Sequence, residues 1–90
     1  VFDKNYHFIS SFGDGLSFPL GFDIENDKMY VTNTYESRID VFSLEGKKVF
    51  SFGSRGRGEG QFRYASDIAV DDKHVYVIDT DNNRIQVFTH

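Results

Sequence analysis

The sequence predicts an all-β fold, and three observations lead to this prediction. Aromatic side chains make up 17% of the 90 residues, with ten Phe and five Tyr, although only 39% of the residues are hydrophobic. Aromatic and β-branched residues suit a half-buried pleated surface. Short runs of these residues alternate with clusters of Gly, Asn, Asp and Lys, and no stretch keeps a helical period. The same runs also recur along the chain.

The strands are expected in order along the chain, separated by turn-forming residues. One strand is expected at residues 8–12, and a blade of four strands over residues 20–52. Three more strands are expected within residues 66–88. The turns between them are residues 25–28, 36–37, 45–47, 71–73 and 81–83.

Internal repetition indicates how these strands are organised. The recurring segments are Val1-Phe2, Val41-Phe42 and Val87-Phe88; Ser11-Phe12-Gly13 and Ser51-Phe52-Gly53; and Arg38-Ile39 and Arg84-Ile85. The offsets are 40 and 46 residues. They differ because the second repeat carries a longer Gly-rich loop after Gly53. One four-stranded propeller blade uses about 40–45 residues. The sequence therefore predicts β-propeller blades of four antiparallel strands, two blades per chain, with one blade split between the chain ends.

The second repeat resembles a known family. Its Gly-rich segment, residues 53–62, is followed by Ile-Ala-Val-Asp at 68–71, Val-Tyr-Val-x-Asp at 75–79 and Asn-Arg-Ile-Gln-Val-Phe at 83–88. This series resembles the NHL repeat. The first repeat is a looser match, with Asn33 where Asp79 stands. The resemblance implies a β-propeller that acts as a binding scaffold, most often with six blades, although one fold hosts many functions.

Two blades cannot close a ring, because propellers close with about 4–8 blades. We therefore expect self-association into a homotrimer of six blades, with an eight-bladed tetramer as the alternative. In this ring, we expect a strand of one chain to complete a blade of the next. Such an exchange satisfies the backbone hydrogen bonds of the edge strands and gives closed symmetry. Its residues are Phe8, Ile9 and Phe12 of one chain, pairing with Ile85, Val87 and Phe88 of the next. A further hypothesis is that the chain is an engineered or dissected propeller piece without a natural ligand.

Basic and aromatic residues gather in and beside the Gly-rich loop. Arg55, Arg57, Arg63 and Tyr64 lie in this loop, and propeller geometry places Tyr35 on the same face. This loop face is expected to bind a protein or peptide. Single-stranded RNA is the alternative, since Arg pairs with phosphates and aromatic rings stack on bases. The net charge of −4 argues against broad nucleic-acid binding.

Catalytic, metal and cofactor sites are not expected. The Gly-rich loop lacks the Lys followed by Ser or Thr of a phosphate-binding P-loop. Asp79-x-Asp81-x-Asn83 opens like a calcium loop, but the sixth position is Arg84 instead of Gly. The three His residues are scattered, and no Ser-His-Asp or Cys-His arrangement is present.

Localisation stays open from the sequence. The chain contains no apolar run of about 20 residues, so no membrane span is expected. Its first residues lack the charged-then-apolar plan of a signal peptide, and the absence of cysteine leaves the redox compartment undetermined.

Overall fold

The computed structural model describes residues 11, 13 and 15–89, and this part of the chain forms three β-sheets. The first sheet has the order β1-β2-β3-β4, with every neighbouring pair antiparallel. Its strands are β1 (Pro19–Glu25), β2 (Lys28–Asn33), β3 (Arg38–Ser43) and β4 (Lys48–Phe52). This four-stranded antiparallel sheet has the architecture of one propeller blade, and the predicted all-β class is confirmed.

The second sheet repeats the first three strands. It contains β7 (Ala65–Val70), β8 (His74–Asp79) and β9 (Arg84–Thr89), again antiparallel and in that order. Between the sheets, β5 (Ser54–Arg55) and β6 (Gln61–Phe62) form a short parallel pair within the Gly-rich segment, which the sequence did not predict. The strand expected at residues 8–12 lies outside the described residues, apart from Ser11, which is in no strand.

Both sheets use the same turn between their second and third strands. A single 3₁₀ turn follows the second strand, η1 (Thr34–Glu36) in the first sheet and η2 (Thr80–Asn82) in the second. Each turn ends on a left-handed residue, Ser37 with φ 57° and Asn83 with φ 55°. Asn tolerates this conformation better than most residues. The shared geometry shows that Ser37 occupies the structural position of Asn83.

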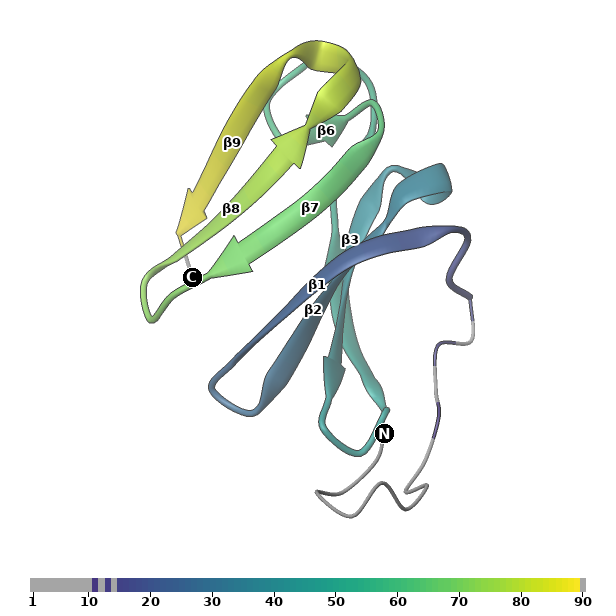
Figure 1. Cartoon of the computed structure of the whole chain (residues 1–90), viewed down its shortest axis with the longest axis vertical. Helices are drawn as coiled ribbons and strands as arrows, with labels where there is room; N and C mark the ends of the chain where they lie inside the picture. Colours follow the sequence, from purple (N-terminus) through teal and green to yellow (C-terminus); the bar gives the residue numbers. More distant parts are fainter. Residues whose placement is uncertain (1–10, 12, 14, 90) are drawn as a thin grey trace.

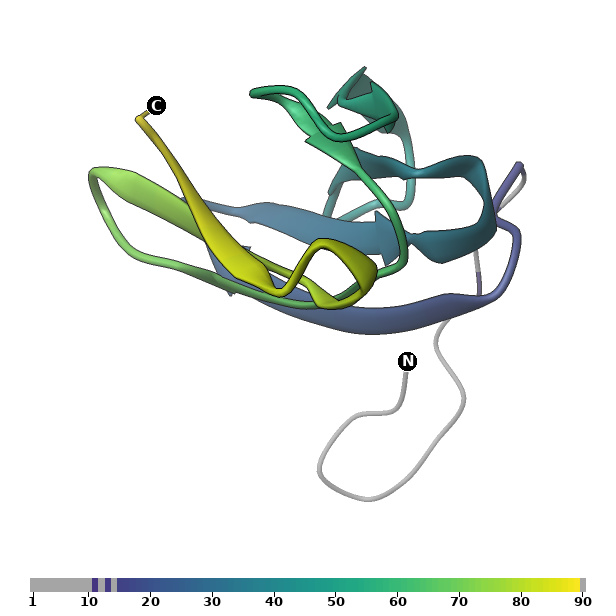
Figure 2. The same cartoon turned by 90° about the horizontal axis from the view of Figure 1, so that it is seen from above.

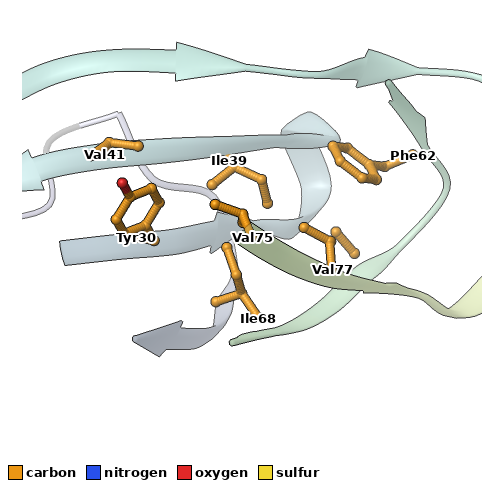
Figure 3. Close-up of a cluster of buried hydrophobic side chains, with 8 residues drawn as sticks. Tyr30, Ile39, Val41, Phe62, Ile68, Val75 and Val77 are labelled. Atoms are coloured by element: carbon orange, nitrogen blue, oxygen red, sulfur yellow. The ribbon is translucent and has the colours of Figure 1, made fainter. Parts of the chain in front are cut away.

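The two sheets pack face to face and form one core. The two views show them side by side (Figures 1 and 2). Tyr30, Ile39 and Val41 of the first sheet lie against Ile68, Val75 and Val77 of the second (Figure 3). All six are buried, and Phe62 and Ala65 complete the cluster. We call this packing the internal joint. Because burial of apolar surface contributes about 25 cal/mol per Å², the internal joint stabilises the pair of sheets.

Polar contacts fix the relative position of the two sheets. The buried Thr34 hydroxyl donates to the carbonyl oxygen of Ala65 at 2.7 Å. The backbone N–H of Val70 donates to the Asp23 carboxylate at 2.7 Å. These bonds join the first sheet to β7, so the joint has directional contacts in addition to its apolar core.

Candidate ligand-binding face

A hollow opens between the two blades on the side of the η1 and η2 turns. Its volume is about 450 Å³. The lining residues come from η1, the Gly-rich segment, the approach to β7 and η2: Thr34, Tyr35, Ser37, Arg55, Arg63, Tyr64 and Asp81. Four of the five residues proposed from sequence for the loop face therefore meet at one place, although they lie far apart in the chain. We call this feature the inter-blade hollow.

Arg55 connects the Gly-rich segment to the first blade. Its Nη2 donates to the carbonyl oxygen of Tyr35 at 3.0 Å. The Tyr35 ring is exposed and stacks on Phe18, with ring centroids 4.6 Å apart. This stacked pair gives one wall of the hollow a flat aromatic surface beside a guanidinium group.

Arg63 and Tyr64 form the opposite wall, and their backbone is fastened to η2. The carbonyl oxygens of Arg63 and Tyr64 accept hydrogen bonds from the N–H groups of Asp81 and Thr80, at 3.0 and 3.1 Å. Tyr64 adopts a left-handed φ of 69°. Within the described part of the chain, the Arg63 guanidinium forms no ion pair. A rigid backbone therefore presents a cation that is available to a ligand.

The fifth candidate, Arg57, does not line the hollow. It lies at the exposed tip of the Gly-rich segment. Arg38 does not line the hollow either; it pairs with Asp40 at 3.0 Å and lies 4.0 Å from Glu36. The hollow thus holds two arginines and one carboxylate, that of Asp81.

Beneath the hollow, the buried Asp79 carboxylate organises the Gly-rich segment. It accepts hydrogen bonds from the Arg63 N–H at 2.8 Å, Asn82 Nδ2 at 2.9 Å, Arg84 Nε at 3.1 Å and Gln86 Nε2 at 3.2 Å. Burial alone would raise the pKa of Asp79, but these hydrogen bonds outweigh it and lower the pKa. The group is therefore a fixed anion at neutral pH. We call these five residues the Asp79 network.

The same donors also hold the loop that carries Arg55. Arg84 Nη2 donates to the carbonyl oxygens of Gly58 and Gln61 at 2.8 and 2.9 Å. Asn82 Nδ2 donates to the Gly56 carbonyl at 3.0 Å. The Gly-rich segment is therefore bonded at three carbonyls, which explains how a chain rich in Gly keeps a defined shape.

The first repeat builds the equivalent network with two residues exchanged. Adding the offset of 46 residues aligns Asn33 with Asp79 and Asp40 with Gln86. In the first sheet, Asn33 Nδ2 donates to the buried Asp40 carboxylate at 2.7 Å, and Arg38 Nε donates to it at 3.0 Å. Each blade thus keeps one carboxylate, one amide and one arginine. Sequence reasoning recorded Asn33 as a departure from the pattern and missed the compensating change at Asp40.

The residues expected to mediate self-association differ in their exposure, and some of them lie outside the described residues. Ile85 and Val87 are exposed on the second sheet. Phe88 packs within its own chain, with ring centroids 5.2 Å from Phe52 and 6.0 Å from Phe62. Phe8, Ile9 and Phe12 lie outside the described residues.

Within residues 11, 13 and 15–89, no group of three or more His, Cys, Asp or Glu side chains is placed to hold a metal ion. Asp79 of the calcium-like spacing instead accepts the hydrogen bonds of its network. Across the same residues, no helix has the length and apolar character needed to cross a membrane.

The fold defines the class of protein. Four-stranded antiparallel sheets that pack face to face in sequence order are the units of β-propellers. Within this class, residues 62–88 match the family model for the NHL repeat. The matched segment begins at Phe62 and covers nearly all of the second sheet. This part of the chain is an NHL repeat, as the resemblance in the sequence predicted.

Proposed function

We propose that the chain is a non-enzymatic NHL scaffold that self-associates into a closed ring and binds a protein or peptide at the inter-blade hollow. The observation that carries the binding proposal is the convergence of Tyr35, Arg55, Arg63 and Tyr64 around one hollow. Tyr and Arg are enriched where protein interfaces gain most of their binding energy. The NHL repeat is consistent with an interaction module.

The chemistry of the hollow favours a peptide segment that carries a carboxylate. Arg63 forms no ion pair with the described residues, and an Arg guanidinium binds a carboxylate through two parallel hydrogen bonds. The exposed Tyr35 ring offers a flat surface for an apolar or aromatic neighbour in the ligand. Asp81 on the rim disfavours a ligand with several adjacent acidic groups.

Two features support self-association. The second sheet ends at β9, whose outer edge pairs with no strand among the described residues. Exposed strand edges and exposed apolar faces both favour association. A homotrimer would supply six blades, and a tetramer would supply eight.

Selection from a displayed library of random short peptides tests the binding proposal. We expect selected peptides to carry a carboxylate and to lose about tenfold or more in affinity with Arg63→Ala, which corresponds to about 1.4 kcal/mol. Arg57→Ala is the matched control, because Arg57 lies outside the hollow, and it should bind within twofold of the wild type. Equal losses for both variants would contradict the site, and failure to select any peptide would favour a propeller piece without a ligand.

Single-stranded RNA is the second candidate, favoured by the same combination of arginines and tyrosines. Its binding would depend steeply on salt, since three phosphate contacts give roughly a 20-fold loss between 50 and 200 mM salt. A fluorescent oligouridine therefore separates the candidates. Salt-sensitive binding that disappears with Arg55→Ala plus Arg63→Ala would support RNA, and no binding at micromolar protein would exclude it.

A further inference from the structure

Each sheet has one face in the internal joint and an opposite face that exposes apolar side chains. On the second sheet, the outer face carries Ile78, Ile85 and Val87, all exposed. On the first sheet, Phe22 and Ile24 of the outer face are exposed, whereas Val31 and Phe42 of the same face are buried. The molecule therefore presents two different apolar faces, one on each blade.

The outer face of the second sheet is the counterpart of a face that is fully covered in the first. With the offset of 46 residues, Ile39 corresponds to Ile85 and Val41 to Val87. Ile39 and Val41 are 0% exposed because the second sheet covers them, whereas Ile85 is 64% and Val87 is 56% exposed. The same strand positions are thus core in one blade and surface in the other.

The outer face of the first sheet shows the complementary relation. Phe22 corresponds to Ile68, and Ile24 corresponds to Val70. Ile68 is 6% exposed in the internal joint, and Phe22 is 61% exposed. The described chain therefore contains both halves of a second joint, but on opposite sides of the molecule, where they cannot meet within one copy.

We propose that the exposed face of the second sheet packs against the exposed face of the first sheet of another copy of this chain. The two sheets would be arranged much as they are in the internal joint. This inference rests on the proposed self-association and specifies its contact. Ile85 and Val87 of one copy would cover Phe22 and Ile24 of the next. The contact is head-to-tail, as a closed cyclic ring requires.

A hollow on the second sheet supports this arrangement. It has a volume of about 240 Å³ and is lined by Asp67, Ile68, Ala69, Tyr76, Ile78 and Ile85. An apolar cavity of about 150 Å³ is sufficient for a benzene ring. In the internal joint, Ile68 belongs to the same cluster as Tyr30 and Ile39, which are the first-sheet equivalents of Tyr76 and Ile85. Phe22 of another copy, which corresponds to Ile68, would place its ring in this hollow.

One of the two polar contacts of the internal joint has a counterpart, whereas Asp23, which accepts from the Val70 N–H, corresponds to Ala69. In the internal joint, the Thr34 hydroxyl donates to the Ala65 carbonyl at 2.7 Å. The corresponding residues are Thr80 and Pro19, and Pro19 keeps the carbonyl acceptor. Within the described chain, the exposed Thr80 hydroxyl instead bonds the Ser66 hydroxyl at 2.6 Å. The bond between Thr34 and Ala65 therefore has a donor and an acceptor at the equivalent positions of the second joint.

The close approach of β1 and β7 sets one condition on the second joint. A Cβ atom on Gly21 would lie 2.9 Å from the Asp67 Cα, so the internal joint requires glycine in the first sheet. In the second joint the equivalent position is Asp67, opposite Gly21 of the next copy. Because Asp67 has a Cβ atom, the two sheets must lie slightly farther apart at this point than in the internal joint.

Two single substitutions and their mixture test the proposal. Phe22→Asp alters only the first-sheet face, and Ile85→Asp alters only the second-sheet face. Light scattering should show each variant as a 10.4 kDa monomer. An equimolar mixture should give a species of about 20.8 kDa, twice 10.4 kDa, because one intact joint forms and the chain cannot extend. Leu44→Asp, at an exposed turn residue outside both faces, should keep the wild-type mass.

The outcomes separate this inference from the proposal on which it rests. A monomeric wild type would overturn self-association itself. A wild-type oligomer that persists in both variants would overturn only the assignment of the faces, and so would a mixture that stays monomeric. Circular dichroism establishes that each variant is folded, and Phe22→Ala and Ile85→Ala are the milder substitutions if an Asp variant is not.

Discussion

The first blade has an amide where the second has a carboxylate, and a carboxylate where the second has an amide. Exchanging these two side chains in the second blade tests whether the two arrangements are equivalent. Asp79→Asn combined with Gln86→Asp would give this blade the arrangement that Asn33 and Asp40 have in the first. Each carboxylate has one arginine partner, but Asp40 also pairs with Lys48 at 3.1 Å, whereas Asp79 accepts from Asn82 Nδ2 at 2.9 Å. The double variant should therefore keep the bond between amide and carboxylate and the arginine pair, whereas neither single variant keeps both.

The magnitudes follow from burial and from the number of partners. Asp79→Asn removes the carboxylate that pairs with Arg84, and breaking a buried pair costs about 3–5 kcal/mol. The side chain of Arg84 is 31% exposed, which places the expected loss near 3 kcal/mol. Gln86→Asp brings a second carboxylate beside Asp79, in place of an amide 3.2 Å away. This repulsion should cost about 2 kcal/mol.

The double variant should lie within about 1–2 kcal/mol of the wild type. The residual loss arises because Gln86 Oε1 also accepts a hydrogen bond from the Gly60 N–H at 3.0 Å, which the shorter Asp does not reproduce. The two single losses of about 3 and 2 kcal/mol, less the double loss of about 1–2 kcal/mol, give an expected coupling free energy of about 3–4 kcal/mol. Urea unfolding, followed by tyrosine fluorescence at one fixed protein concentration, measures all four proteins. Additive losses in the double variant would refute the equivalence of the two networks.

Three further predictions concern the backbone, the internal joint and pH. Gly53→Ala should lose about 2–4 kcal/mol of unfolding free energy, because Gly53 has φ +99° and a Cβ there would overlap the Phe62 ring; Gly60→Ala, at φ +75° with no neighbour within 4 Å, should lose only about 1–2 kcal/mol by the same urea assay. Thr34→Val should cost about 1–2 kcal/mol by thermal unfolding, because it leaves the Ala65 carbonyl without its donor, and an unchanged melting temperature would show that this bond does not fasten the joint. The pKa of Asp79 in the folded chain lies below its unfolded value of about 3.9. The stability that the Asp79 carboxylate contributes is therefore complete above that value and is lost as pH falls through the folded pKa. Urea unfolding at a series of pH values should show that Asp79→Asn loses less unfolding free energy in acid than the wild type does.

The strands were predictable because local chemistry sets their ends. Turn residues such as Asn26 and Asp27 adopt left-handed φ values of 52° and 60°, and the β-rich runs on either side pair across them. The β5–β6 pair was not predictable, because its two-residue strands carry no periodic signal and their pairing depends on the Asp79 network. Long-range contacts, more than local propensity, decide such segments.

The candidate site was predictable in composition and less so in detail. Arginine and tyrosine in a loop indicated a binding face, and the repeat placed Tyr35 near them. The side on which each arginine projects depends on how the loop is bonded, and this bonding comes from Arg84 and Asn82. Arg57 therefore lies outside the hollow although its neighbour in the pattern, Arg55, lines it.

The mass of the wild-type chain in solution tests the central claim most directly. Size-exclusion chromatography with light scattering should give about 31 kDa, three times 10.4 kDa, for a closed ring of six blades. A mass near 42 kDa, four times 10.4 kDa, would keep the ring and change its number of blades. A mass of 10.4 kDa across the accessible concentration range would contradict self-association.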